Sequence, residues 1–507
     1  MTMDAAGMGT ASADQPGRTG AIRKLETGVP GLDVLTYGGI PAGRSTLVVG
    51  RSGTGKTILG LQTLAHLAHQ GVTGLLLAVE EAPEDLIVSG DSLGFDLSGL
   101  VRAGKLHISD VTQPMDGPVM VSGDYDISGL VHRIDSMAKR SGARMVVVDS
   151  ATALFSPRPA DNVLRNLFFQ LVFALRKMDL TAMILAEAPS DYGERLTTLG
   201  VEDYVCDAVI ILRNVPDGAR RRRSIEVNKY RRSPHYKGEY PCTITAKGLA
   251  IFPLDAVDRA AGEQIERYSS GFPGLDQMLG GGLVRDSISI VRGPTGSGKT
   301  MLAGLYARAG ADRSERVVYY GFEEPRPILL RNFAQIGMSM DEYERSGHLQ
   351  VVCRYPEAMS LEDLLVHFRL HMEEFQPSLI VLDSISSIEH ASSEKGFRQF
   401  MIGVAALLRK HGRSALLTQT VTSGESGRHT APYLSTIADA ILSLDYSVDE
   451  YEMQRSVRVI KMRGGAHDTH PYRLKIGQGG LSVDKMPPPW GRERRDGDTQ
   501  ISAGEKA

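Results

Sequence analysis

Short apolar runs alternate with longer amphipathic stretches along nearly the whole chain of 507 residues. Runs predicted as strands span residues 45–49, 74–79, 145–148 and 182–186 in the first half, and residues 287–291, 317–321, 379–382 and 414–418 in the second. Helix-like segments separate these runs, and such alternation is typical of a mostly parallel sheet with helices on both faces. We therefore expect an α/β fold with ligands at the carboxyl ends of its strands.

Two Gly-rich segments match the pattern G-x-x-x-x-G-K-[ST], at residues 50–57 and 293–300. Each follows an apolar run and opens a helix-like segment, which is the context that a phosphate-binding loop (P-loop) requires. In this motif backbone N–H groups surround the phosphates, the lysine reaches the β/γ-phosphates and the last hydroxyl ligates Mg²⁺. The predicted nucleotide-binding residues are Ser52, Gly53, Thr54, Gly55, Lys56 and Thr57, and Thr295, Gly296, Ser297, Gly298, Lys299 and Thr300. The chain is therefore expected to bind two nucleotides.

The duplication extends beyond the two loops. The segment Thr27–Asp33 recurs as Ser270–Asp276, and the pair Glu80-Glu81 recurs as Glu323-Glu324, both at the spacing of 243 positions that separates the two loop lysines. This repeat predicts two tandem P-loop domains. The expected divisions are a disordered N-terminus at residues 1–20, a first domain at 21–252, a linker at 253–268, a second domain at 269–485 and a disordered tail at 486–507.

Composition narrows the class of protein. A hydrophobic content of 42% is enough for two cores. The net charge of −3 and the aromatic content of 6% do not favour nucleic-acid binding. The three cysteines, Cys206, Cys242 and Cys353, lack the spacing of a zinc site or a disulfide framework. No apolar run approaches the roughly 20 residues that cross a bilayer, so we expect a soluble cytoplasmic protein without membrane partners.

Acidic residues stand at the ends of the predicted strands. Asp149 and Asp383 each end an apolar run, where a carboxylate can hold Mg²⁺ directly or through water. An aspartate that caps the following turn is the alternative. The predicted metal ligands are Thr57, Asp149, Thr300, Glu323 and Asp383.

The paired glutamates are the candidate catalytic residues, Glu80, Glu81, Glu323 and Glu324. They follow the strand after the loop helix, and from there a carboxylate can orient or deprotonate a nucleophile beside the γ-phosphate. Exposed glutamates that open a helix are the alternative.

The sequence resembles the KaiC family of circadian-clock ATPases and autokinases. The tandem P-loops and paired glutamates carry this resemblance together with residues 207–215, 220–223, 237–241 and 461–464, and it covers about residues 21–480. It implies two RecA-like domains, ATP and Mg²⁺ bound between neighbouring subunits, and a homohexameric double ring. It also implies a slow ATPase in the first domain and an autokinase and autophosphatase in the second.

The resemblance implies further site residues. Ser435 and Thr436 match the family's phosphorylated Ser-Thr pair, although hydroxyls that cap a helix or turn are the alternative. Lys229 and Arg231, with Lys461 and Arg463 in the second domain, match cations that approach the γ-phosphate held by the adjacent subunit. Solvent-facing strand cations are the alternative there. Additional nucleotide contacts are implied at Ser92, Tyr230, His235, Arg455 and Met462. At His235 a structural histidine is the alternative.

Some positions depart from the family. Thr430-Ala431 replaces a Thr-Asp pair, Ile336 replaces a tryptophan near the adenine, and His390 replaces an arginine. The sequence after Ile476 does not resemble the segment that engages the activator KaiA. We therefore expect KaiA-type control to be absent or altered, whereas a KaiB-like partner stays compatible with the sequence. Two other functions remain open: a RecA/DnaB-like ATPase stimulated by nucleic acid, and a signalling scaffold that binds ATP without autokinase activity.

Overall fold

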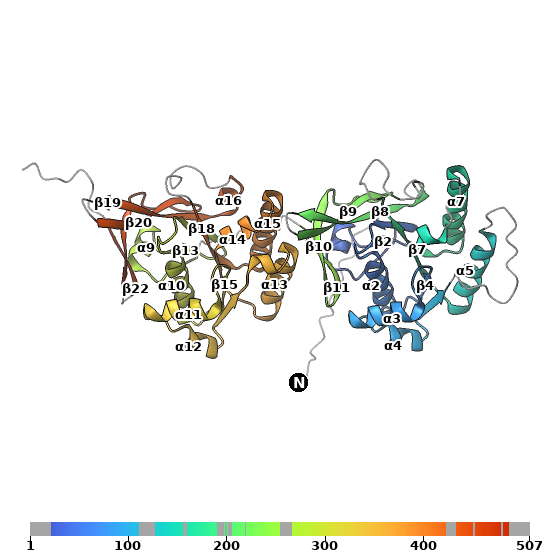
Figure 1. Ribbon diagram of the computed structural model, residues 1–507, viewed down its shortest axis with the longest axis horizontal. Coiled ribbons are helices and arrows are strands. Elements are labelled where there is room, and N and C mark those ends of the chain that lie inside the picture. The colour runs from blue at the N-terminus through green and yellow to red at the C-terminus, as the bar shows by residue number, and fades with distance from the viewer. Residues whose placement is uncertain are drawn as a thin grey trace, which may run out of the picture. The chain divides into compact units, whose positions relative to one another are not determined.

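A computed structural model describes the chain in two units, Met1–Pro253 and Leu254–Ala507 (Figure 1). The described residues are 22–110, 127–155, 160–189, 197, 200, 205–217, 220–253, 266–421, 432–449, 452–477 and 480–485. The termini predicted to be disordered, residues 1–20 and 486–507, lie outside them, as do most of the expected linker and the pair Thr430-Ala431. Each unit is an α/β domain with one nine-stranded sheet, as the alternating pattern predicts.

The sheet of the first unit has the strand order β11-β10-β9-β8-β3-β7-β6-β4-β5. Strands β3 to β8 form its parallel part, and β9 to β11 continue it in antiparallel pairing. Its strands are β3 (Ser45–Gly50), β4 (Gly74–Ala78), β5 (Leu106–Asp110), β6 (Met145–Asp149), β7 (Thr181–Glu187), β8 (Ala208–Asp217), β9 (Arg220–Tyr230), β10 (Glu239–Thr245) and β11 (Gly248–Ile251). A small sheet joins β1 (Lys24–Leu25) to β2 (Ile40–Pro41).

Helices cover both faces of this sheet (Figure 1). They are α1 (Leu32–Leu35), α2 (Lys56–His69), α3 (Pro83–Ser92), α4 (Leu97–Arg102), α5 (Ser128–Ser141), α6 (Ala151–Leu154) and α7 (Asp161–Lys177). Side chains alternate across a strand, so Val48 packs with α2 while its neighbour Val49 packs with α7. Both faces of the parallel strands are buried, so β4 is apolar throughout and β3 and β6 are mainly apolar.

The second unit repeats this arrangement with the order β16-β15-β17-β18-β14-β19-β20-β21-β22. Its strands are β14 (Ile288–Gly293), β15 (Val317–Gly321), β16 (Leu349–Cys353), β17 (Leu379–Asp383), β18 (Ser414–Thr420), β19 (Ala440–Asp449), β20 (Glu452–Met462), β21 (Tyr472–Gly477) and β22 (Gly480–Lys485), with β12 (Arg267–Tyr268) and β13 (Leu283–Val284) in a small separate sheet. Its helices are α9 (Pro273–Met278), α10 (Lys299–Asp312), α11 (Arg326–Gln335), α12 (Met340–Arg345), the short 3-10 helix η1 (Pro356–Ala358), α13 (Leu361–Glu374), α14 (Ile385–His390), α15 (Glu394–His411) and α16 (Pro432–Ile437).

The parallel register fixes which features share an edge of the second sheet. β14 runs beside β19 with Ser289 opposite Ala440 and Arg292 opposite Ser443. The P-loop leaves β14 at its carboxyl end, whereas α16 enters β19 at its amino end. The P-loop and α16 of one chain therefore lie at opposite edges of the same sheet.

Candidate nucleotide sites

The first P-loop joins β3 to α2 at the carboxyl edge of the first sheet. Gly53 and Gly55 have φ of 74° and 103°, a left-handed conformation that side chains disfavour, and Gly55 is the cap from which α2 starts. The Lys56 ammonium donates to the carbonyls of Gly50 at 2.9 Å and Arg51 at 3.1 Å. Burial lowers the pKa of Lys56, and the carboxylates of Glu187, Asp149 and Glu80 partly oppose this. The cation is thus held inside the loop, where a phosphate chain can replace the carbonyls as its partner.

Asp149 lies at the end of β6, beside the P-loop helix. It is 9% exposed, and this burial raises its pKa to about 6. A hydrogen bond with Thr57 lowers the pKa, while the charges of Glu80 and Glu81 raise it further. Glu80 in turn accepts a hydrogen bond from Ser150 Oγ at 2.5 Å. The predicted metal residues Thr57 and Asp149 and the predicted catalytic residue Glu80 therefore lie together.

The second P-loop repeats this geometry. Lys299 donates to the carbonyls of Gly293 and Pro294, both at 2.9 Å, and burial lowers its pKa while Glu323 and Asp383 oppose this. Gly296 and Gly298 again have positive φ, 78° and 102°, and Gly298 caps α10. The two loops hold their lysines in the same way, as the sequence motif predicts.

Asp383 is more enclosed than its counterpart, and burial raises its pKa. Its Oδ2 accepts a hydrogen bond from the Tyr319 hydroxyl at 2.6 Å, and its Oδ1 accepts one from Thr418 at 2.5 Å. Thr300 also hydrogen-bonds to it and, like the other two hydroxyl groups, acts to lower the pKa. The motifs predicted Thr300 but gave no signal for Tyr319, because its role depends on which strands are neighbours.

The two second-domain glutamates have different partners. Glu323 Oε1 accepts hydrogen bonds from Ser384 Oγ at 2.6 Å and Ser387 Oγ at 3.2 Å. Glu324 instead accepts from Asn332 Nδ2 on α11 at 3.0 Å. Glu323 is therefore the member of the pair that is oriented by the segment following Asp383. Its negative charge also acts to raise the pKa of Lys299.

The candidate acceptors Ser435 and Thr436 lie on α16 at the amino edge of the second sheet. Lys461 donates to the carbonyls of Ser435 at 2.5 Å and Ala438 at 2.8 Å, and Arg463 donates to the Thr436 carbonyl at 3.0 Å. Arg463 also pairs with Asp439 at 3.3 Å. The structure thus brings together the predicted acceptors and the predicted cations of one chain, away from that chain's own P-loop.

The first unit has the same strand arrangement but a different sequence at this edge. Arg231 N donates to the Asp207 carbonyl, as Arg463 N does to that of Asp439, both at 2.8 Å. This register aligns Ser435 and Thr436 with Asp203 and Tyr204, which lie outside the described residues. Lys229 lies opposite Val209 on the neighbouring strand, as Lys461 lies opposite Ile441. The cations are therefore duplicated, whereas the hydroxyl pair is not.

The remaining predicted nucleotide contacts differ in whether they reach a P-loop of their own chain. Arg455 reaches the second P-loop of its own chain, where its Nε donates to the Gly296 carbonyl at 3.3 Å. Tyr230 is buried and its hydroxyl donates to the Gly39 carbonyl at 3.0 Å, while Met462 packs against the second core. Ser92 donates to the Ser89 carbonyl at the end of α3. His235 is half-buried after β9. Within their own chain, Tyr230, Met462 and Ser92 are thus engaged in packing or local hydrogen bonds.

The donor set fits Mg-ATP. Each loop offers a left-handed glycine cradle, a buried lysine, a threonine hydroxyl and one strand-end carboxylate. Among the described residues no three His, Cys, Asp or Glu side chains cluster as a metal site. Mg²⁺ in such sites takes one or two protein ligands and completes its shell with waters and phosphate oxygens. The pairs Thr57 with Asp149 and Thr300 with Asp383 supply that set.

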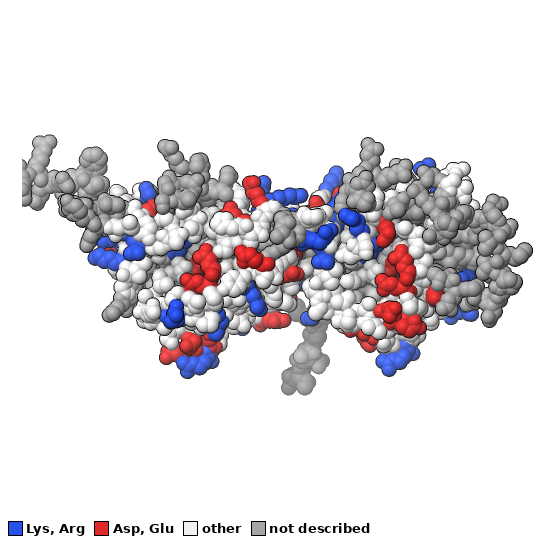
Figure 2. Space-filling view, in the orientation of Figure 1, with Lys and Arg blue, Asp and Glu red and all other residues white. Residues whose placement is uncertain are grey.

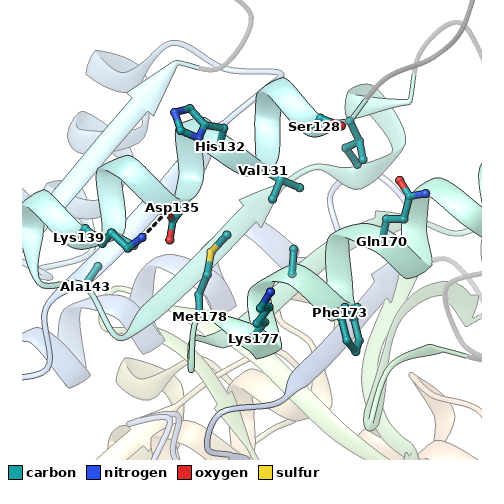
Figure 3. A pocket seen from close by; sticks show the side chains of 13 residues that line it. Ser128, Val131, His132, Asp135, Lys139, Ala143, Gln170, Phe173, Lys177 and Met178 are labelled. Carbon is teal, nitrogen blue, oxygen red and sulfur yellow. Dashed lines mark hydrogen bonds and ion pairs between the residues drawn. The ribbon is translucent and has the colours of Figure 1, made fainter.

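A cavity of about 900 Å³ lies elsewhere, between α5 and α7 of the first unit (Figure 3). Its lining includes His132, Asp135 and Lys139 from α5 and Phe173 and Lys177 from α7. It contains no residue of the P-loop, the glutamate pair or the metal pair. The candidate nucleotide sites therefore belong to the edges of the sheets and not to this cavity.

Acidic and basic side chains are interspersed over the displayed face of each unit (Figure 2). None of the helices that the structure describes is both long and apolar enough to span a membrane.

Comparison with known proteins gives consistent matches. The family model described as "ATPase: KaiC" matches residues 25–256 and again residues 268–487. The chain is 39% identical to the circadian clock oscillator protein KaiC of Picosynechococcus sp. over 99% of this chain and 97% of that protein. It is 39% identical to the KaiC of Rippkaea orientalis over 96% of this chain and 94% of that protein. For the KaiC of Synechococcus elongatus the identity is 40% over 91% of this chain and 89% of that protein.

Proposed function

Because the chain belongs to the KaiC family of ATPases, we propose that it hydrolyses Mg-ATP in its first domain and phosphorylates and dephosphorylates Ser435 and Thr436 in its second. The relatives to which this chain is similar are named circadian clock oscillator proteins. A clock or timer role is the corresponding proposal for this chain.

The observation that carries the proposal is the placement of Ser435 and Thr436. They lie at the amino edge of the second sheet, one strand length from the P-loop of the same chain. β14 has six residues, which span roughly 20 Å at about 3.3 Å per residue. Phosphoryl transfer requires the reacting atoms to be within about 3.5 Å. A phosphate on these hydroxyls would therefore have to come from the P-loop of a neighbouring copy.

The cations beside α16 also support phosphoryl transfer between chains. Lys461, near the end of β20, and Arg463, just after β20, donate to carbonyls of α16 at the amino edge of the sheet. In a ring, this edge of one chain would face the P-loop edge of the next. Both cations could then stabilise the charge on the transferred phosphoryl group, as an arginine finger does. The homohexamer that the resemblance implies provides this arrangement six times.

The residues around the second P-loop, at the carboxyl edge of the sheet, would have separate roles. Lys299 would hold the phosphates, and Thr300 with Asp383 would hold Mg²⁺, which neutralises charge on the phosphates when bound. Glu323, oriented by Ser384 and Ser387, would accept the proton of the attacking hydroxyl of the neighbouring chain. In the first domain, Glu80 is oriented by Ser150 and would direct water instead.

Incubation with γ-labelled ATP and Mg²⁺, followed by peptide mass spectrometry, tests the proposal. We expect label on Ser435 or Thr436, little label in Glu323→Gln, and normal label in Glu324→Gln, whose carboxylate is held by Asn332. Absence of label from both hydroxyls with retained ATP hydrolysis would favour a scaffold role for the second domain. Hydrolysis that requires added single-stranded DNA would instead favour the nucleic-acid motor.

A further inference from the structure

The carboxylate of Asp383 is held from both sides by hydroxyl groups of the sheet itself. Tyr319 on β15 donates to Oδ2, and Thr418 on β18 donates to Oδ1. β15 and β18 are the two neighbours of β17, which Asp383 ends. With the hydrogen bond from Thr300, three of the roughly four lone-pair directions of this carboxylate are occupied, and one remains for a further ligand.

The first site lacks this support. β4 pairs with β6 as β15 pairs with β17, so Leu76 takes the place of Tyr319 beside the strand that ends in Asp149. On the other side Leu185 lies opposite Asp149, in the position corresponding to Thr418. Both leucines are buried, and a leucine side chain has no hydrogen-bond donor. Asp149 therefore has its hydrogen bond with Thr57 but neither of the two strand-borne donors.

The Tyr319 ring is itself fixed in place. It is completely buried and packs edge-on against Phe333 at a centroid distance of 5.7 Å. Its hydroxyl therefore cannot swing away from Asp383 without disturbing the core between β15 and α11. This gives the hydroxyl a defined position before any metal or nucleotide binds.

We propose that Tyr319 is a positioning residue that fixes the metal-binding carboxylate of the second site and makes that site bind the divalent cation more tightly than the first. A carboxylate already held in one orientation loses less freedom when it binds a metal. Partners of this outer shell typically change metal affinity by about 10- to 100-fold when removed. The inference rests on the proposed binding of Mg-ATP by the second domain.

The test is Tyr319→Phe, which removes the hydroxyl and keeps the ring. Tyr320→Phe is the matched control, because Tyr320 is the next residue of the same strand, points to the opposite face and has its hydroxyl hydrogen-bonded with His371 Nδ1. Both changes are made in full-length protein carrying Asp149→Asn, which weakens the first metal site. Mn²⁺ binding is measured by electron paramagnetic resonance in the presence of a non-hydrolysable ATP analogue.

We expect Tyr319→Phe to weaken Mn²⁺ binding by about 10-fold and Tyr320→Phe to change it by less than about 2-fold. Equal affinities in the two variants and their parent would overturn the inference. Equal weakening in both, with equal loss of thermal stability in metal-free protein, would also overturn it by showing a general effect on the strand. If the parent binds no Mn²⁺ at the second site, the proposed function fails together with the inference.

Discussion

The buried carboxylate of Asp149 predicts that replacing it with asparagine stabilises the protein in the absence of metal. Its pKa rises from an ordinary 3.8 to about 6 because burial penalises the charged form. At 1.36 kcal/mol per pKa unit, this difference corresponds to about 3 kcal/mol. Asp149→Asn removes the buried charge and keeps an oxygen that can accept from Thr57, so the first domain should gain up to about 3 kcal/mol near pH 8.

The sign of the pH dependence follows from the raised pKa. The folded protein binds this proton more tightly than the unfolded chain, so stability falls as pH rises from about 4 to about 6. Below that range Asp149 is neutral in the folded state and little penalty remains. The advantage of Asp149→Asn should therefore shrink from about 3 kcal/mol near pH 8 to about 1 kcal/mol near pH 4.5.

Urea unfolding followed by circular dichroism, with EDTA and without nucleotide, measures both quantities. Asp85→Asn is the control, because Asp85 is exposed in the first turn of α3, where the loss of its charge costs at most about 1 kcal/mol. Mg-ATP at about 1,000 times its dissociation constant should reverse the order, because it should stabilise the unsubstituted protein by about 4.1 kcal/mol. Equal stability of Asp149→Asn and the parent near pH 8, or an advantage independent of pH, would show that the buried charge of Asp149 does not destabilise the fold.

Three further predictions address individual residues. Glu80→Gln should lower ATP hydrolysis by the first domain about 100-fold or more while label on Ser435 and Thr436 persists, as measured by phosphate release and mass spectrometry; an equal loss of label would contradict separate sites. Arg463→Ala should reduce label on Ser435 and Thr436 by about 1000-fold without preventing ATP binding, as measured with labelled ATP; unchanged label would remove Arg463 from the transfer site. Mg²⁺ affinity of the first site should fall below about pH 6, where protons compete for Asp149, as measured by calorimetry; affinity independent of pH would contradict the raised pKa.

Much of the fold could be predicted from the sequence because its signals are local. The apolar runs of β3, β4, β6 and β7 lie within one or two residues of their predicted spans. The P-loops are also local, because their glycines, lysine and threonine lie within eight consecutive positions. The family and the α/β architecture with tandem domains are confirmed.

The contacts within the second site could not be predicted, because they depend on which strands become neighbours. Tyr319, Thr418 and Asp383 meet only because β15 and β18 flank β17. The sequence around Tyr319 does not indicate that its hydroxyl bonds to a carboxylate. The separation of Ser435 from its own P-loop likewise follows from the parallel pairing of β14 and β19. The roles assigned to Ser435, Thr436 and the cations beside them stay predictions.

Mixing two complementary variants shows whether the phosphoryl group passes between chains. The first variant carries Lys299→Ala and keeps the acceptor hydroxyls; the second carries Ser435→Ala and Thr436→Ala and keeps the second P-loop. After mixing, subunit exchange and addition of γ-labelled ATP with Mg²⁺, we predict label on Ser435 or Thr436 of the Lys299→Ala chain, and none when either variant is incubated alone. Label in the unsubstituted protein together with an unlabelled mixture would instead show that each chain phosphorylates itself.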